Sequence, residues 1–273
     1  MADRRAAINR AAAAFATISA TPRLDAELLM AHALGISREA LLLGQLDGPA
    51  PEGFAALVAR RLDHEPIAYI TGTRAFWTIE LQVGPGALVP RADSETLIEA
   101  AVAHFGARAP ATILDLGTGP GTLLLAALDQ WPRAHGLGID ESERALSYAE
   151  INAEDLGMAE RARFRRGDWA AGLQGQFDLI LANPPYIGAG ESLPREVSDH
   201  EPAGALFAGA DGLDDYRIIM PQVPALLAPG GIACIEVGAG QADAVAALVA
   251  AQGLRPGRRA DLAGIDRCVT ASH

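Results

Sequence analysis

Four consecutive residues at the end of an aliphatic run could hold a planar nitrogen group. Residues 179–182 are aliphatic and lead directly into Asn183, Pro184, Pro185 and Tyr186. The asparagine side-chain oxygen and the Pro184 carbonyl can each accept an N–H bond, and the prolines stiffen the backbone that carries them. Tyr186 supplies a ring that can pack on a flat amide or base. The stretch therefore predicts a binding site for an –NH2 group on a planar system.

Such a nitrogen is a poor nucleophile because its lone pair is delocalised. Acceptors that hold both N–H groups aim the lone pair and stabilise the positive charge that develops as the nitrogen attacks a methyl group. The proton can leave afterwards, so no strong general base is required. The motif suits methylation of adenine N6, cytosine N4 or glutamine N5, and by itself does not choose among them. Asn183, Pro184 and Tyr186 are the expected catalytic residues, and Asn183 to Tyr186 the expected substrate-binding residues.

A glycine-rich loop upstream could bind the methyl donor. The segment "ILDLGTGPGT" (113–122) is an apolar strand followed by three glycines at alternate positions. Glycine permits positive φ and close approach of a ligand, but the third glycine comes one residue too early for the dinucleotide pattern GxGxxG. The spacing fits the acid-x-Gly-x-Gly-x-Gly loop of methyltransferases that use S-adenosylmethionine (SAM) and release S-adenosylhomocysteine (SAH). The expected cofactor-binding residues of this loop are Gly117, Thr118, Gly119, Pro120 and Gly121.

Polar and aromatic residues follow the next two strands along the chain. Asp140 ends "GLGID", where its carboxylate could accept hydrogen bonds from both ribose hydroxyls of SAM. Asp168 and Trp169 follow the third strand and offer an acceptor and a flat surface for adenine. Each feature alone is common, but together they come in the right order for a SAM site that also includes Asn183.

These residues can meet only if parallel strands bring their carboxyl ends to one edge of a sheet. Residues 92–273 alternate apolar strand segments with helical ones, which predicts a mostly parallel, doubly wound α/β sheet. The strand segments are "ATILDL", "GLGID", "RFRRGD", "FDLILANP", "GIACIEVG" and "DRCVTAS", and the helical segments are 120–130, 141–156, 212–227 and 241–252.

The first part of the chain is different. Residues 1–74 predict a small helical bundle: Thr21 and Pro22 open one helix, Gly35 ends it, Ser37 caps the next, and Pro51 starts another. Residues 75–91 predict a β-hairpin linker whose turn lies at 84–86, a Gly-Pro-Gly sequence. We expect the bundle to be either a lid or a recognition module, and residues 92–273 to form the methyltransferase domain.

Composition limits the possible partners. The 273 residues carry a formal net charge of −12, which argues against nonspecific binding to nucleic acid. Cys234 and Cys268 are the only cysteines, so packing roles in a reducing compartment and no structural zinc site are expected. The N-terminal stretch reads as an amphipathic helix, not a signal peptide, and no apolar run is long enough to span a bilayer. We expect a cytoplasmic monomer that binds no metal, membrane or nucleic acid directly.

Beyond these patterns, the chain resembles the HemK/PrmC family, the N5-glutamine methyltransferases of peptide chain release factors. The resemblance runs in family order from residue 65, and the preceding helices fit by pattern only. It is carried by "EPIAYITGTRAFW" (65–77), "VGPGALVPRADSETL" (83–97), "DLGTGPGT" (115–122), "NPPYI" (183–187), "HEPAGALFAGADGLDDYR" (200–217), "LAPGGIACIEVG" (227–238) and "DLAGIDR" (261–267). One departure is Ala92, where the family usually has proline, which affects local rigidity and not the chemistry.

The resemblance implies a seven-stranded SAM-methyltransferase sheet after the N-terminal bundle. It implies that Asn183 to Tyr186 hold the glutamine of the Gly-Gly-Gln loop of a bacterial class I release factor, and that the bundle grips the factor outside that loop. Arg91 and Glu201 lie in family segments and are expected near the site with a structural or positioning role. The alternative for each is an ion pair at a domain interface or a cap.

Three alternatives remain. A ribosomal-protein glutamine methyltransferase would share the glycine loop and "NPPY", although "PIAYITG" and "PRADSET" favour the release factor. A DNA adenine methyltransferase would need a basic DNA-facing surface and a target-recognition domain. A SAM-binding regulatory protein would have no need for the intact residues from Asn183 to Tyr186.

Overall fold

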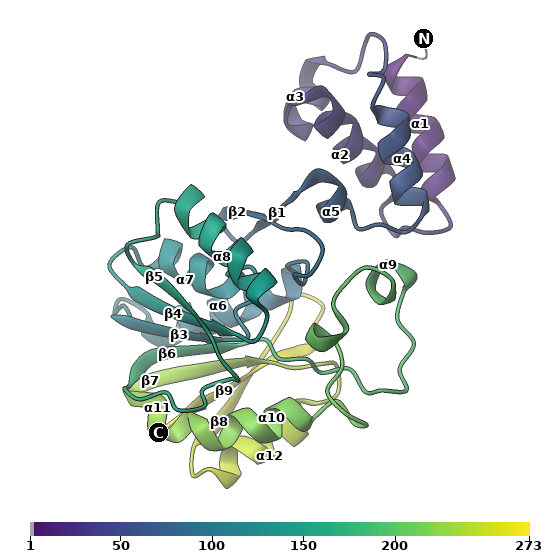
Figure 1. The fold of residues 1–273 in the computed structure, drawn as a ribbon. Coiled ribbons are helices and arrows are strands. Elements are labelled where there is room, and N and C mark those ends of the chain that lie inside the picture. Colours follow the sequence, from purple (N-terminus) through teal and green to yellow (C-terminus); the bar gives the residue numbers. More distant parts are fainter. Residues whose placement is uncertain (1–2) are drawn as a thin grey trace. The chain divides into compact units, whose positions relative to one another are not determined.

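The computed structural model describes residues 3–273, and the chain passes through two units (Figure 1). The first unit comprises the chain up to Thr73 together with Leu193–His200. The second comprises Arg74–Ser192 and Glu201–His273. A segment far along the sequence therefore belongs to the same unit as the N-terminal helices.

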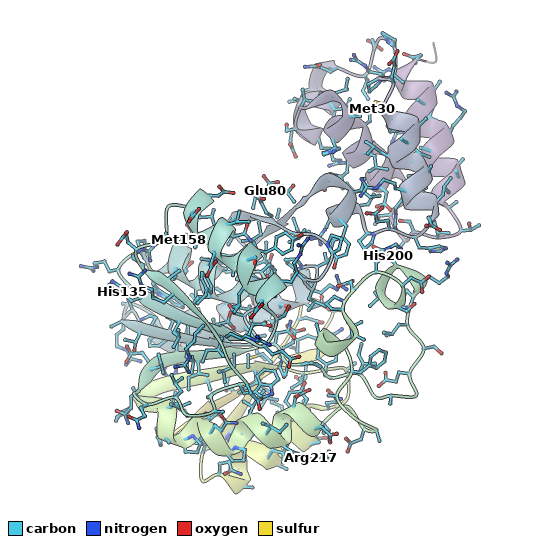
Figure 2. The ribbon with its side chains drawn as sticks, in the orientation of Figure 1. Met30, Glu80, His135, Met158, His200 and Arg217 are labelled. Atoms are coloured by element: carbon cyan, nitrogen blue, oxygen red, sulfur yellow. The ribbon has the colours of Figure 1, made fainter. Side chains whose placement is uncertain are left out.

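The first unit is helical, as predicted. Its buried core is made by residues such as Ile8, Phe15, Leu29 and Leu41, and Met30, labelled in Figure 2, also belongs to it. The helices are α1 (Arg4–Phe15), α2 (Pro22–Leu34), α3 (Arg38–Gly44), α4 (Phe54–Leu62), α5 (Ile67–Thr71) and, from the distant segment, α9 (Arg195–Ser198).

Local signals in the sequence set some of these helix ends and not others. Gly35 adopts φ of 65° and ends α2, and the Ser37 side chain accepts the N–H of Ala40 at the start of α3. Thr21 was expected to cap α2, but its hydroxyl instead donates to the side chain of Asp25, 3.2 Å away. Helix α4 begins at Phe54, three residues after the proline predicted to start it.

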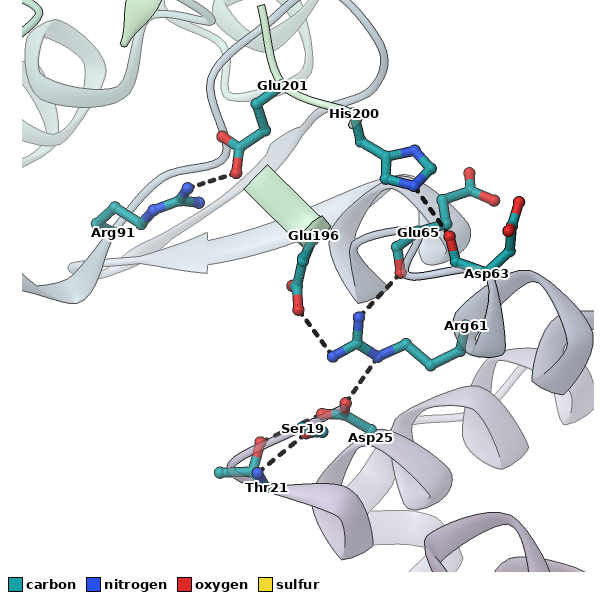
Figure 3. Close-up of polar contacts among 10 residues, drawn as sticks. All are labelled: Ser19, Thr21, Asp25, Arg61, Asp63, Glu65, Arg91, Glu196, His200 and Glu201. Carbon is teal, nitrogen blue, oxygen red and sulfur yellow. Dashed lines mark hydrogen bonds and ion pairs between the residues drawn. The ribbon is translucent and has the colours of Figure 1, made fainter. Parts of the chain in front are cut away.

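A buried arginine attaches the distant segment to the bundle (Figure 3). Arg61 is 3% exposed, and its guanidinium contacts Asp25 at 2.9 Å, Glu196 at 2.8 Å and the Glu65 carbonyl at 3.2 Å. The ring of His200 lies 3.2 Å from the backbone oxygen of Asp63. Leu193–His200 is therefore held by a charged contact to α4 and a polar contact to the turn that follows α4.

A short hairpin precedes the main sheet. Strands β1 (Thr73–Phe76) and β2 (Ile79–Gln82) pair, and the chain reverses at Trp77, which adopts φ of 54°. The predicted turn at residues 84–86 exists, since the Ala87 N–H donates to the Gly84 carbonyl, but it follows β2. The predicted position of the hairpin turn was wrong because a tryptophan, without any glycine signal, takes the left-handed conformation.

The second unit contains the predicted α/β sheet. Its seven strands lie in the order β5-β4-β3-β6-β7-β9-β8; the first five are parallel, and β9 runs antiparallel to both neighbours (Figure 1). The strands are β3 (Thr112–Leu116), β4 (His135–Asp140), β5 (Ala162–Arg166), β6 (Phe177–Ala182), β7 (Leu227–Glu236), β8 (Arg255–Ala260) and β9 (Asp266–Ser272). Strand β8, "RPGRRA", lacks an apolar pattern because it is an edge strand with mostly exposed residues.

Helices pack on both faces of this sheet. Helices α6 (Glu95–Phe105), α7 (Thr122–Gln130) and α8 (Glu143–Asp155) lie on one face, and α10 (Asp214–Ile219), α11 (Val223–Leu226) and α12 (Ala242–Ala251) on the other (Figure 1). The helix predicted over 212–227 is interrupted by a 3-10 turn (Met220–Gln222). Pro221 in this turn and Pro224 at the start of α11 each remove a backbone donor. This layered arrangement brings the carboxyl ends of β3, β4, β5 and β6 to one edge.

Candidate active site

A cavity of about 310 Å3 opens at that edge, within the second unit. Its size is close to the lower end of ligand pockets, roughly 300 Å3. Of the residues predicted to bind cofactor or substrate, those that line it are Gly117, Thr118, Gly119, Pro120, Asp140, Asp168, Trp169, Asn183 and Pro185. Gly121, Pro184 and Tyr186 are not among the lining residues.

The glycine loop after β3 uses positive φ at each of its three glycines. Gly117, Gly119 and Gly121 have φ values of 72°, 57° and 86°. A Cβ at Gly117 would lie 3.1 Å from the Trp169 ring, and one at Gly119 would meet nothing within 4 Å. At Gly121 a Cβ would come within 2.8 Å of Leu125, so this glycine permits helix packing and does not face the cavity.

Asp140 at the end of β4 ties the strand to the loop. Its two carboxylate oxygens accept the backbone N–H groups of Gly119 and Ser142, each at 2.8 Å. Burial raises the pKa of Asp140, against the lowering effect of these hydrogen bonds. Each oxygen keeps a lone pair that can accept a ligand hydroxyl.

Trp169 stands beside the loop in a strained backbone conformation. Its φ is 47°, which is uncommon for a bulky residue. The carboxylate of Asp215, another lining residue, hydrogen-bonds to the Trp169 side chain. Asp168 is exposed at the cavity. Trp169 thus offers a flat aromatic surface, and Asp168 a neighbouring hydrogen-bond acceptor, to a nucleobase such as adenine.

The sequence reasoning did not assign a role to Asp115, the acid that begins the glycine motif. Its side chain is buried and lines the cavity. Oδ2 accepts the Thr118 hydroxyl at 2.7 Å and the Leu124 N–H at 3.2 Å, whereas Oδ1 has no partner within residues 3–273. Burial raises the pKa of Asp115 to about 7. The acid-x-Gly pattern in the sequence could have identified Asp115 as a site residue. It could not show that one of its carboxylate oxygens has no hydrogen-bond partner within residues 3–273.

This set of groups fits SAM. The unpaired, buried Asp115 oxygen suits an ammonium group. Asp140 can accept two ribose hydroxyls, Trp169 offers a face for adenine, and the space next to Gly119 leaves room against the backbone. Among the described residues, no three His, Cys, Asp or Glu side chains are grouped so that they could hold a metal ion.

Asn183 follows the last residue of β6 and has an oriented amide. Its Nδ2 donates to the hydroxyl of Ser94, 3.2 Å away. Its Oδ1 makes no hydrogen bond within residues 3–273, so it can accept one from a ligand. Asn183 and Ser94 both line the cavity.

Tyr186 packs away from the cavity lining. A Cβ at Gly238 would lie 3.0 Å from its ring, so glycine is needed there. Burial raises the pKa of Tyr186 to about 12. Its backbone carbonyl accepts Nε2 of Gln241 at 2.9 Å, and Oε1 of Gln241 accepts the Gly238 N–H at 3.0 Å. One half-buried side-chain amide, that of Gln241, therefore connects the turn after β6 to the turn after β7.

Arg91 and Glu201 meet, as expected for residues near the site. They form an ion pair within the second unit (Figure 3). The other Glu201 oxygen accepts the Val89 N–H at 3.0 Å. Arg91 and Pro202 line the cavity. The pair joins two segments of the cavity wall, and the alternative of an ion pair between domains is wrong.

Comparisons with known proteins agree with this architecture. The family described as PrmC N-terminal domain matches residues 6–72, and the family described as methyltransferase domain matches residues 108–252. A release factor glutamine methyltransferase from Rhodospirillum rubrum is 48% identical over 259 residues, 92% of this chain and 78% of the relative. One from Cereibacter sphaeroides is 45% identical over 98% of this chain and 96% of its own.

The fold has counterparts among solved structures. A methyltransferase from Pyrococcus furiosus superposes with a TM-score of 0.54 at 17% identity, covering 78% of this chain and 95% of that one. At this identity the likeness concerns the fold alone. No helix among the described residues combines enough length and apolar character to cross a bilayer.

Proposed function

The chain belongs to the family of release factor glutamine methyltransferases, and from this we propose the reaction. The enzyme transfers a methyl group from SAM to the side-chain amide nitrogen (N5) of a glutamine in a release factor. This glutamine is the one in the Gly-Gly-Gln loop of bacterial class I factors. The observation that carries the site assignment is Asn183, whose nitrogen is engaged by Ser94 and whose oxygen is left for a substrate N–H.

SAM supplies an electrophilic methyl group on a sulfonium sulfur. The chain's own residues hold the substrate amide: the Asn183 oxygen and the Pro184 carbonyl accept its two N–H groups, so that its lone pair is directed and developing positive charge is stabilised. The two prolines limit the backbone freedom of these acceptors. Asp115, Asp140 and Trp169 hold the cofactor through its ammonium, ribose and adenine groups.

Tyr186 has a supporting role in this proposal. Its ring packs at Gly238 and its carbonyl is held by Gln241, so it fixes the far end of the turn that Asn183 begins. Packing of the ring against the substrate amide remains a prediction. The first unit, which includes residues 6–72 of the matched N-terminal domain, grips the release factor outside the Gly-Gly-Gln loop.

Labelled methyl transfer tests the function. Purified release factor, a ribosomal protein and DNA are each incubated with the enzyme and labelled SAM, and the product is located by mass spectrometry. One added methyl on the glutamine of the Gly-Gly-Gln loop is expected. Label on the ribosomal protein or DNA, with none on the release factor, would overturn the substrate and keep the reaction class.

A further inference from the structure

Three sequence segments outside the SAM and substrate motifs meet behind Asn183. Ser94 comes from "PRADSET", Glu236 from the end of β7 and Arg267 from "DLAGIDR". Ser94 and Glu236 are 2% and 1% exposed. The sequence patterns alone assign none of these residues a part in the reaction, although all three lie in the same buried region of the second unit.

The strand register explains why Glu236 lies next to the substrate-binding turn. Strands β6 and β7 are parallel, and Ala182 is paired with Ile235. The next residues are Asn183 on one strand and Glu236 on the other, so both emerge at the same level of the same edge. The Glu236 backbone carbonyl accepts the Tyr216 hydroxyl at 2.9 Å, which holds this end of β7 in place.

From these contacts we infer that Ser94 and Glu236 are positioning residues, which orient the Asn183 amide so that its oxygen faces the substrate. The inference rests on the proposed function, because it concerns how the same site holds the glutamine. It assigns Ser94 and Glu236 no contact with substrate or cofactor.

The direction of the hydrogen bonds carries the argument. The Ser94 hydroxyl has one proton and is hydrogen-bonded to Glu236, whose pKa burial raises to about 7; above that pH the carboxylate is ionised and can only accept. Above that pH, Ser94 therefore donates its proton to Glu236 and presents lone pairs to Asn183. Only the NH2 end of the Asn183 amide can donate to them, as the 3.2 Å contact from Nδ2 shows. The amide oxygen is then turned away from Ser94.

Glu236 also reaches the other end of the turn, since the Tyr186 hydroxyl hydrogen-bonds to its carboxylate. One buried group thus orders both Asn183, through Ser94, and Tyr186 directly. Arg267 stabilises the negative charge electrostatically while its own guanidinium pairs with Asp93 at 3.2 Å and Asp261 at 3.1 Å.

A merely structural role would not need a carboxylate here. Burying a charge is costly, and apolar replacements of buried ionic groups are often neutral or stabilising. One Glu236 oxygen, Oε2, even lacks a partner within residues 3–273. In its ionised form the carboxylate only accepts hydrogen bonds and gives the network a single direction, which a neutral group that both donates and accepts would not.

The test compares Ser94→Ala, Ser94→Thr, Glu236→Gln and the double variant Ser94→Ala/Glu236→Gln. The control is Thr112→Ala, which removes a hydroxyl bonded at 3.3 Å to a carboxylate on β6, at the opposite edge of the same sheet. Steady-state kinetics use labelled SAM and release factor, and calorimetry measures SAH binding. NMR measures hydrogen exchange of the Asn183 side-chain NH2, a readout that does not depend on the substrate.

Ser94→Ala is expected to lower kcat by about tenfold to a hundredfold, with SAH affinity within about twofold, because a misaligned acceptor affects the reaction and not cofactor binding. Exchange of the Asn183 NH2 should become faster. Ser94→Thr should restore both values, and the double variant should be no slower than the slower single variant, because both act through one network. Thr112→Ala should leave kcat and exchange unchanged.

Equal Asn183 exchange in wild type and Ser94→Ala would overturn the inference whatever the substrate is. A normal kcat in Ser94→Ala, or a Ser94→Thr variant as slow as Ser94→Ala, would also overturn it. Failure of the wild-type enzyme to methylate the release factor would overturn the proposed function instead, while the exchange measurement would still decide how Asn183 is oriented.

Discussion

The carboxylate of Asp140 accepts the backbone N–H of Gly119 at 2.8 Å, so the end of β4 is joined directly to the glycine loop after β3. The same carboxylate is the proposed acceptor for ribose hydroxyls. Binding of the cofactor and the shape of its loop therefore depend on one side chain.

Asp140→Ala should weaken SAH binding by roughly tenfold to a hundredfold, the expected loss for hydrogen bonds to a charged acceptor. Asp140→Asn keeps one oxygen and should lose less. Isothermal titration calorimetry with SAH measures both. Asp178→Ala is a control, since its carboxylate bonds Ala111 and Thr112 at the opposite edge of the sheet. An unchanged dissociation constant for Asp140→Ala would remove this residue from the ribose role.

Asn183→Ala should abolish detectable methyl transfer or lower kcat by about a hundredfold or more, since a pre-positioned acceptor is removed from the reacting group. SAH should still bind, because Asp115, Asp140 and Trp169 remain. Single-turnover transfer of labelled methyl to the release factor, alongside SAH calorimetry, separates the two effects. Normal turnover by this variant would contradict the mechanism.

Asp115→Asn should change how stability depends on pH in the cofactor-free protein. Burial raises the pKa of Asp115 from 3.8 to about 7, so its folded form binds a proton more tightly than its unfolded form. The stabilising contribution of Asp115 to the free energy of unfolding is fully present below about pH 4 and is lost as the pH rises toward 7. The asparagine variant cannot ionise at this position, so its free energy of unfolding does not fall in this way. The difference is a few kcal/mol for a pKa shift of about three units.

Thermal unfolding of both proteins at pH 5 and pH 8 checks this. The variant should gain stability relative to wild type at the higher pH. Glu236, whose pKa burial also raises to about 7, is present in both proteins and cancels in the comparison. SAH should nevertheless bind the variant more weakly. The asparagine side chain can place its NH2 group where the free Asp115 oxygen would accept a hydrogen bond from the SAH ammonium. Parallel stability curves would show that the pKa of Asp115 is not raised in the folded protein, so that its carboxyl is already ionised at pH 5.

Arg61→Met should destabilise the first unit by about 3–5 kcal/mol, the usual cost of leaving a buried ion-pair partner uncompensated. The partner left behind is Asp25, which is 5% exposed. Arg60→Met is the matched control, since Arg60 is the adjacent residue of α4 and pairs with Glu65 at 2.5 Å in a more exposed position. It should cost about 1 kcal/mol or less.

Native-state hydrogen exchange of amides in α2 and α4 measures these differences within the first unit. Equal exchange in the two variants would mean that the buried position of Arg61 carries no extra stability.

The order of strands and the residues at their ends could be predicted from sequence, because parallel strands place successive carboxyl ends at one edge. Asp140 and Asn183 follow directly from that rule. Ser94 and Glu236 could not be predicted, since their contact with the turn depends on a loop before α6 folding behind β6 and β7. Gly121 could be assigned to the loop by spacing, but its packing against Leu125 depends on the position of a helix.

Two errors in the prediction from sequence, the position of the hairpin turn and the missing edge strand β8, have local causes. Trp77 carries no turn signal yet adopts positive φ, and β8 is rich in arginine with no apolar alternation. The association of Leu193–His200 with the first unit has no local signal at all, because it depends on contact between the buried Arg61 and Glu196, 135 residues later.

Because of that association, the two units are not two consecutive stretches of the chain. The chain passes from one unit to the other three times, after Thr73, after Ser192 and after His200. A truncation at Thr73 would leave Arg61 without Glu196 and the methyltransferase unit with an unanchored insertion. A chimera that exchanges the bundle and keeps these contacts must therefore transfer residues 193–200 together with the N-terminal helices.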